Sequence, residues 1–185
     1  MIVLASKSPR RKEILKALGY DFMVCPALKD EVFDLSLGLD EALKKVAESK
    51  AKEVRESYLD SIILSADTIV CLDDKILGKP KSEEDAYKML KDLSGKVHRV
   101  YSAVVVVNSK TNKVKKECIF TEVKFKDLTN EEILKYISTK EPLDKAGAYG
   151  IQGFGGVFVE RINGCYYNVV GLPLNLLNNI LEEIK

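Results

Sequence analysis

The stretch Ile62-Ile63-Leu64-Ser65-Ala66-Asp67-Thr68-Ile69-Val70-Cys71-Leu72 is apolar on both sides of a single charge. Its β-branched and aliphatic residues predict a strand that lies inside a sheet. Asp73-Asp74 follows directly and is typical of a tight turn, so Ile76-Leu77 is expected to return as the second strand of a hairpin.

Predicted strands and helices intermix along the whole chain on both sides of this strand. Ser8, Ser82 and Thr129 are candidate N-caps, and Glu132 forms a capping box with Thr129. This order predicts the α/β class, with a mixed sheet and flanking helices. The expected strands are residues 2–5, 21–24, 62–72, 76–77, 97–107, 114–124, 157–161 and 166–170, and the expected helices are residues 8–19, 40–58, 82–95, 129–139 and 173–184.

The composition is that of an ordinary globular protein. The chain has 185 residues, of which 46% are hydrophobic and 31% charged, enough for one compact domain or two small lobes that share a sheet. Lys and Arg number 29 against 28 Asp and Glu, which argues against a broad electrostatic surface for nucleic acid or an anionic membrane. No apolar run approaches the ~18 residues of a membrane span, and no signal peptide is recognisable.

The four cysteines, Cys25, Cys71, Cys118 and Cys165, lie far apart and form no C-x-x-C pair. Such cysteines are more often small buried hydrophobes in a reducing compartment than disulfide partners or metal ligands. The sequence therefore predicts a cytoplasmic protein.

The first predicted helix has an unusual first turn. Arg10 and Arg11 lie there, although cations at a helix N-terminus oppose the macrodipole. The helices that begin at Ser82 and Thr129 instead start with acidic residues. A bound phosphate would explain the exception, because free backbone N–H groups and two guanidinium groups suit it, and the Ser6 hydroxyl could add a donor. The alternative is a solvated basic surface that tolerates a small penalty.

Asp67 is the charge inside the apolar stretch. An isolated buried carboxylate costs several kcal/mol unless it is paired, protonated or bound to a metal. It could be a metal ligand or a base that activates water, or it could cap backbone N–H groups at a strand end.

Lys50 lies on the apolar face of the helix predicted over residues 40–58. Its head could reach solvent while the stem stays buried, or it could face an anion inside the fold.

Four segments of the chain together resemble the Maf family of nucleotide pyrophosphatases. The segments are Leu4-Ala5-Ser6-Lys7-Ser8-Pro9-Arg10-Arg11 with Glu13-Ile14-Leu15, Ser65-Ala66-Asp67-Thr68-Ile69-Val70, Leu77-Gly78-Lys79-Pro80, and Asn168-Val169-Val170-Gly171-Leu172-Pro173-Leu174. They follow in the family's order with sensible spacing, which makes the set far more specific than any one motif.

The resemblance implies roles for particular residues. The substrate phosphates would be held by the amino-terminal segment together with Lys50 and Lys79, and Asp67 would be the catalytic acid–base residue. A divalent cation, Mg²⁺ or Mn²⁺, would be held by Asp67 with Glu31. The implied phosphate ligands are Ser6, Arg10, Arg11, Lys50 and Lys79.

The glycine-rich stretch Asp144-Lys145-Ala146-Gly147-Ala148-Tyr149-Gly150-Ile151-Gln152-Gly153 closely resembles the branch of the family that acts on thymidine and uridine triphosphates. Glycines there allow close approach of the backbone to a ligand, or simply tight turns. Gln152 can both donate and accept, as the reading of a pyrimidine edge needs. In family terms Arg10, Thr68 and Gln152 help to set specificity. His98, the one histidine, also belongs to the family pattern, and a single histidine is more often structural.

The fold implied by the resemblance is a single domain over residues 1–185, with two lobes around a central cleft, similar to inosine triphosphate pyrophosphatases. The implied reaction is metal-dependent cleavage between the α and β phosphates, giving a nucleoside monophosphate and pyrophosphate. The substrates favoured are dTTP and UTP, the role is nucleotide-pool housekeeping, and a homodimer would be consistent with it. The alternatives are a nucleotide-binding regulator of cell division with little turnover and, third, a nucleic-acid-binding protein.

Overall fold

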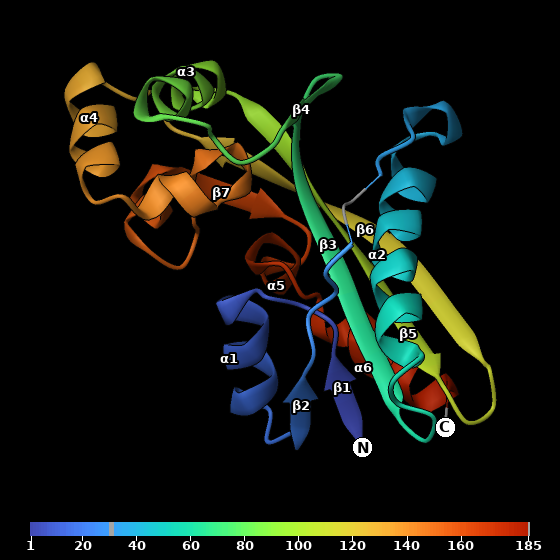
Figure 1. Ribbon diagram of the computed structural model, residues 1–185. Helices are drawn as coiled ribbons and strands as arrows, with labels where there is room; N and C mark the ends of the chain where they lie inside the picture. The colour runs from blue at the N-terminus through green and yellow to red at the C-terminus, as the bar shows by residue number, and fades with distance from the viewer. Residues whose placement is uncertain (30–31, 185) are drawn as a thin grey trace. The chain divides into compact units, whose positions relative to one another are not determined.

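The computed structural model describes residues 1–29 and 32–184 and has the α/β architecture expected from the sequence (Figure 1). The strands are β1 (Ile2–Leu4), β2 (Phe22–Val24), β3 (Ile62–Leu72), β4 (Lys75–Leu77), β5 (Val97–Asn108), β6 (Val114–Phe125) and β7 (Val159–Asn163). The α-helices are α1 (Pro9–Ala17), α2 (Leu39–Arg55), α3 (Glu83–Leu93), α4 (Asn130–Ser138), α5 (Tyr166–Val170) and α6 (Leu174–Glu183). Short 3₁₀ segments cover Leu35–Leu37, Glu141–Asp144, Ala146–Ala148 and Phe154–Phe158.

The sheet is seven-stranded and mixed, with the order β2-β1-β3-β5-β6-β7 and with β4 paired to β3 off this path. Strand β1 runs parallel to β2 and to β3, in a register that sets Leu4 opposite Leu64. Strands β4 and β7 pair antiparallel with β3 and β6. The mixed sheet predicted from the intermixed elements is therefore confirmed.

The residues divide into two compact units. The first comprises Met1–Asp67, Ser102–Ile119 and Gly171–Lys185, and the second comprises Thr68–Tyr101 and Phe120–Val170. The long strands β3, β5 and β6 each contribute residues to both units, and the boundary on β3 falls between Asp67 and Thr68. Each unit has its own buried core.

The core of the first unit forms where α2 packs on β3 (Figure 1). The apolar stripe of α2 is buried, including Leu43, Val46 and Ala47. The Ser65 hydroxyl of β3 donates to the Ala47 carbonyl of α2 at 2.6 Å, which fixes the helix against the strand.

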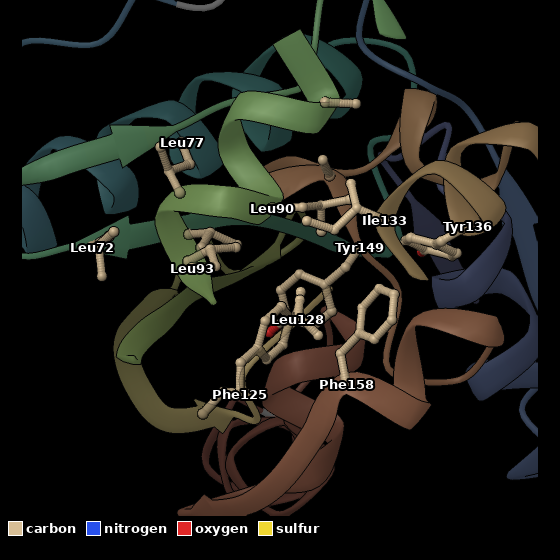
Figure 2. Close-up of a cluster of buried hydrophobic side chains, with 14 of the residues drawn as sticks. Leu72, Leu77, Leu90, Leu93, Phe125, Leu128, Ile133, Tyr136, Tyr149 and Phe158 are labelled. Carbon is tan, nitrogen blue, oxygen red and sulfur yellow. The ribbon is translucent and has the colours of Figure 1, made fainter. Parts of the chain in front are cut away.

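The core of the second unit is a cluster of aliphatic and aromatic side chains from α3, α4, β5, β6 and the segment after α4 (Figure 2). Phe125 lies edge-on to Tyr149 with ring centroids 4.7 Å apart, and Tyr136 lies edge-on to Phe158 at 5.1 Å. Aromatic pairs prefer this arrangement. The cluster therefore gives the residues that follow α4 a rigid support.

One expected element is wrong. Residues 166–170 form the short helix α5 and not a strand. The buried Asn168 explains the difference, because its Nδ2 donates to the Val100 carbonyl at 2.8 Å and to the Thr121 hydroxyl at 3.0 Å. Short apolar runs are ambiguous between helix and strand, and these distant hydrogen bonds decide the outcome. Strand β7 also begins at Val159, after a 3₁₀ turn, and not at residue 157.

All four cysteines are free thiols, and Cys71 alone of them is buried, so the expected burial is wrong for the other three. Among the described residues, no helix combines the length and the apolar character that a membrane crossing needs.

Candidate functional site

The loop between β1 and α1 is closed by its own serines. The Ser8 side chain caps α1 by accepting from the Arg11 backbone N–H at 3.5 Å. The Ser6 hydroxyl accepts from the Ser8 N–H at 3.2 Å and from the Arg11 Nη1 at 3.0 Å. Because both lone pairs of this hydroxyl accept, its proton remains as a donor. The Ser6 hydroxyl can therefore still donate to an anion, and its contact with a phosphate stays a prediction.

Arg11 is a buried residue, only 8% exposed. Its Nε donates to the Gly171 carbonyl at 2.8 Å, in addition to the contact of Nη1 with Ser6. The guanidinium group thus joins the amino-terminal loop to the segment that leads into α6. Arg11 holds the loop in place, a role that the sequence reasoning did not distinguish from phosphate binding.

Arg10 differs from its neighbour. It is half-buried, and within the described ranges it makes no hydrogen bond or ion pair. The first turn of α1 contains no acidic residue, whereas α3 begins with Glu83, Glu84 and Asp85. A cation near free N–H groups at a helix N-terminus suits a phosphate. Arg10 is therefore the guanidinium group that is best available to an anion here.

Asp67 and Lys50 form an ion pair inside the first unit. The Lys50 ammonium of α2 lies 2.7 Å from the Asp67 Oδ1 of β3, and the two side chains are 16% and 15% exposed. Asp67 lies within β3 and not at its end, so it is not a strand-end cap. Lys50 does not extend to solvent either. Pairing accounts for the charge inside the strand, since a buried carboxylate needs such a partner.

The pairing of β1 with β3 sets the start of the amino-terminal loop beside the strand that carries Asp67. Strands β1 and β3 are parallel, and the Ala5 N–H donates to the Leu64 carbonyl at 2.7 Å. The loop that starts at the carboxyl end of β1 thus runs beside the part of β3 that leads to Asp67. Carboxyl ends of parallel strands are common binding positions. We call Ser6, Arg10, Arg11, Lys50 and Asp67 the charged end.

A metal site cannot be built from these side chains alone. The described part of the chain contains no group of three or more His, Cys, Asp or Glu residues that could hold a metal ion. Glu31, the second expected ligand, lies outside the described residues. Mg²⁺ commonly binds one or two carboxylates together with substrate phosphates, so Asp67 alone still fits such an ion.

The remaining candidates belong to the second unit. Thr68 follows Asp67 on β3 and is half-buried. Lys79 is exposed in the turn after β4, where the Gly78 carbonyl accepts from the Gly147 N–H at 3.1 Å. Gln152 is exposed in the glycine-rich loop. The charged end therefore lies in the first unit, whereas Thr68, Lys79 and Gln152 lie in the second.

The glycine-rich loop surrounds side chains of the protein itself. The Glu141 carboxylate accepts from the Phe154 N–H at 3.0 Å, and the Tyr136 hydroxyl donates to it at 2.8 Å. The Gly150 N–H in turn donates to that hydroxyl at 3.1 Å. Sequence reasoning missed Glu141 and Tyr136, and the density of glycines that follows them was the one signal that a close packing partner existed.

His98 lies beneath this loop, only 1% exposed. Its Nε2 is 2.8 Å from the Tyr149 hydroxyl, and its ring lies edge-on to Phe125 and Tyr149. Burial lowers the pKa of His98 from 6.5 to about 4, so the ring is neutral at pH 7. Its Nδ1 has no hydrogen-bond partner among the described residues. The geometry is consistent with the structural role expected for a single histidine.

Known proteins of one family match nearly the whole chain. The family model described as Maf-like protein matches residues 1–184. A dTTP/UTP pyrophosphatase of Clostridium botulinum (strain Eklund 17B / Type B) is 56% identical over 186 residues, which covers 98% of each chain. The protein of the same name from Clostridium novyi (strain NT) is 53% identical, over 99% of this chain and 97% of that protein.

A solved structure shows the same fold at much greater distance. The structure of a HAM1 protein from Coxiella burnetii aligns with a TM-score of 0.55 and 14% identity, over 98% of each chain. A likeness at this identity supports the fold and not the activity.

Proposed function

Because the chain belongs to the Maf-like protein family, we propose that it hydrolyses nucleoside triphosphates, dTTP and UTP before others, to the nucleoside monophosphate and pyrophosphate. Relatives that carry the name dTTP/UTP pyrophosphatase are 47–56% identical over nearly the whole chain, which supports this substrate class. The observation that carries the proposal is the Lys50–Asp67 pair, which holds a carboxylate in the same unit as a cationic helix N-terminus.

The charged end suits the binding of a triphosphate. Arg10, the N–H groups of the first turn of α1 and the Ser6 hydroxyl would contact phosphate oxygens. Arg11 would contribute its charge mainly while holding the loop through Gly171 and Ser6. Charge neutralisation by fixed cations is the main source of catalysis in phosphoryl transfer.

Asp67 would act on the attacking water. Its Oδ1 accepts from the Lys50 ammonium at 2.7 Å. Water attacks the α phosphorus and gives its proton to Asp67, while the bond from that phosphorus to the bridging oxygen breaks and pyrophosphate leaves. Lys50 would hold the carboxylate in the orientation that this step needs.

A divalent cation, Mg²⁺ or Mn²⁺, would be held by Asp67, with Glu31 as the second candidate ligand. When bound, it would neutralise charge on the phosphate oxygens. The charges that the protein itself supplies for the leaving pyrophosphate would be those of Lys79 and Lys50.

Selectivity would depend on Gln152, Thr68 and Arg10. The Gln152 amide is exposed and can donate and accept together, which suits the edge of a pyrimidine base. The enzyme would act on the nucleotide pool of the cytosol, a reducing compartment in which its four free thiols persist.

The test is a pyrophosphate-release assay with canonical and modified triphosphates in Mg²⁺ or Mn²⁺, with orthophosphate measured in parallel and an EDTA arm for the metal. Pyrophosphate from dTTP and UTP ahead of the purine nucleotides is the expected result. Release from other nucleotides would retain the chemistry and overturn the selectivity. Tight nucleotide binding without turnover would instead favour a regulator.

A further inference from the structure

Residues on both sides of Gln152 are hydrogen-bonded to the Glu141–Tyr136 pair. The Glu141 Oε1 accepts from the Tyr136 hydroxyl at 2.8 Å and from the Gly155 N–H at 3.4 Å, and its Oε2 accepts from the Phe154 N–H at 3.0 Å. The Gly150 N–H donates to the Tyr136 hydroxyl at 3.1 Å. The loop is therefore held two residues before Gln152 and two residues after it.

Two glycines of the loop bring its backbone close to the side chains of Glu141 and Tyr136. A Cβ atom at Gly153 would lie 2.4 Å from both Glu141 carboxylate oxygens. A Cβ atom at Gly155 would lie 2.7 Å from the Tyr136 hydroxyl and 2.9 Å from the Gly150 carbonyl. Real Cβ atoms do not approach so closely, so a side chain at Gly155 would meet backbone, and one at Gly153 would displace the Glu141 carboxylate. The glycines thus give the backbone access to Glu141 and Tyr136.

The support beneath the loop is rigid. Tyr136 is 3% exposed on α4 and packs edge-on against Phe158 (Figure 2). The Lys145 ammonium donates to the Glu141 backbone carbonyl at 2.8 Å and to the Asp144 carboxylate at 2.6 Å. Lys145 and Asp144 are therefore used within the scaffold. By contrast, Gln152 at the tip is exposed.

This arrangement does not resemble a catalytic or metal-binding carboxylate. Both Glu141 oxygens accept from N–H or O–H donors of the protein. A carboxylate that accepts several such bonds is held in one orientation and, in turn, orders the backbone that donates them. Glu141 can therefore influence the reaction only by positioning the loop.

We propose that Glu141 and Tyr136 are positioning residues that set the pyrimidine preference, because they fix the place at which the loop presents Gln152. The inference rests on the proposed function and deepens it. A side chain that reads a base by hydrogen bonds needs to be held to a fraction of an ångström, and its misplacement lowers discrimination without touching the phosphates.

The experiment compares Tyr136→Phe and Glu141→Gln with wild type and Gln152→Ala. The ratio of kcat/KM for dTTP to that for dGTP is expected to fall about tenfold in all three variants, because kcat/KM for dTTP falls more than that for dGTP. Glutamine retains one acceptor oxygen of the two, and phenylalanine keeps the ring in the core. Glu160→Gln, an exposed carboxylate on β7 of the same unit, is the matched control and should keep the ratio.

Hydrogen exchange provides a readout that does not depend on turnover. The amides of Phe154 and Gly155 should exchange about tenfold faster or more in Glu141→Gln, with the melting temperature nearly unchanged. Unchanged exchange would overturn the inference even if no nucleotide were hydrolysed. An unchanged ratio in Glu141→Gln and Tyr136→Phe, beside a lost ratio in Gln152→Ala, would overturn it while the proposed function stands. Loss of turnover for every nucleotide in wild type would overturn the function itself.

Discussion

The charged end of the first unit and the glycine-rich loop of the second are held in place by different means. The charged end is attached to regular elements, with Asp67 inside β3, Lys50 on α2 and Arg10 in the first turn of α1. The loop has no regular element of its own beyond short 3₁₀ turns, and the side chains of Glu141 and Tyr136 hold it. We therefore expect the chemistry common to all nucleotides to depend on the charged end, and the loop to present Gln152, one of the proposed selectivity residues.

The strongest test of this comparison is Asp67→Asn. The change removes the proposed base and should lower kcat by about 10²–10⁴-fold for every nucleotide alike, because the water would no longer be activated. Kinetics with dTTP and dGTP measure it, with Asp21→Asn, an exposed carboxylate in the same unit, as the control. Near-normal turnover in Asp67→Asn would remove this residue from the reaction.

Substitutions of the two adjacent arginines should have different effects: loss of Arg11 should lower stability, and loss of Arg10 should weaken substrate binding. Arg11→Ala leaves the Gly171 carbonyl and Ser6 without a charged partner, and should lower the free energy of unfolding by about 2–3 kcal/mol. Arg10→Ala should change that free energy by less than about 0.5 kcal/mol while raising KM for triphosphates. Urea unfolding and steady-state kinetics give both quantities. Equal stability of the two variants would show that Arg11 does not hold the loop.

Acid should weaken the second unit through His98. The folded-state pKa of about 4 lies below the unfolded value of 6.5, so the unfolded chain binds the proton first as the pH falls. Stability is then full above pH 6.5 and is lost progressively down to about pH 4. Between pH 7 and pH 5 the expected loss is about 2 kcal/mol.

Urea unfolding of wild type and His98→Gln at pH 7 and pH 5 isolates this contribution, because both proteins share every carboxylate. The variant should show a smaller decrease in unfolding free energy over that interval. If both lost the same amount, protonation of His98 would not be the cause.

The smallest expected effect is that of Lys79→Ala. Lys79 is exposed, so stability should be unchanged, while kcat/KM should fall about tenfold for all nucleotides because one cation proposed to bind the pyrophosphate is lost. Lys81→Ala, two residues along and also exposed, is the control. A change in the dTTP-to-dGTP ratio in Lys79→Ala would instead connect this turn to selectivity.

Most helices and strands could be predicted from residues that lie close together in the sequence. Ser8, Ser82 and Thr129 cap their helices as the sequence predicts, because capping depends on residues within one turn. Strand β3 has the predicted bounds, since an apolar run with one charge leaves few alternatives. Helix α5 was mispredicted because the bonds of Asn168 reach residues far away along the chain.

The site was predictable in its residues and less so in their arrangement. An isolated charge in a strand and a lysine on an apolar stripe identified Asp67 and Lys50, yet only the structure shows that they pair. Arg10 and Arg11 look alike in sequence, and the difference depends on Gly171, 160 residues away from Arg11. Glu141 lies in an irregular segment without periodicity, so no pattern marked it.

The loop scaffold has a consequence for how substrate range could change during evolution. Tyr136, Glu141, Gln152 and Gly155 all belong to one continuous stretch of chain, whereas the charged end draws on residues from Ser6 to the Gly171 carbonyl. A single recombination event over residues 136–155 could therefore exchange Gln152 together with the side chains that hold its loop between duplicated copies. The hydrolytic machinery would be inherited intact, and new base preferences could arise without an inactive intermediate.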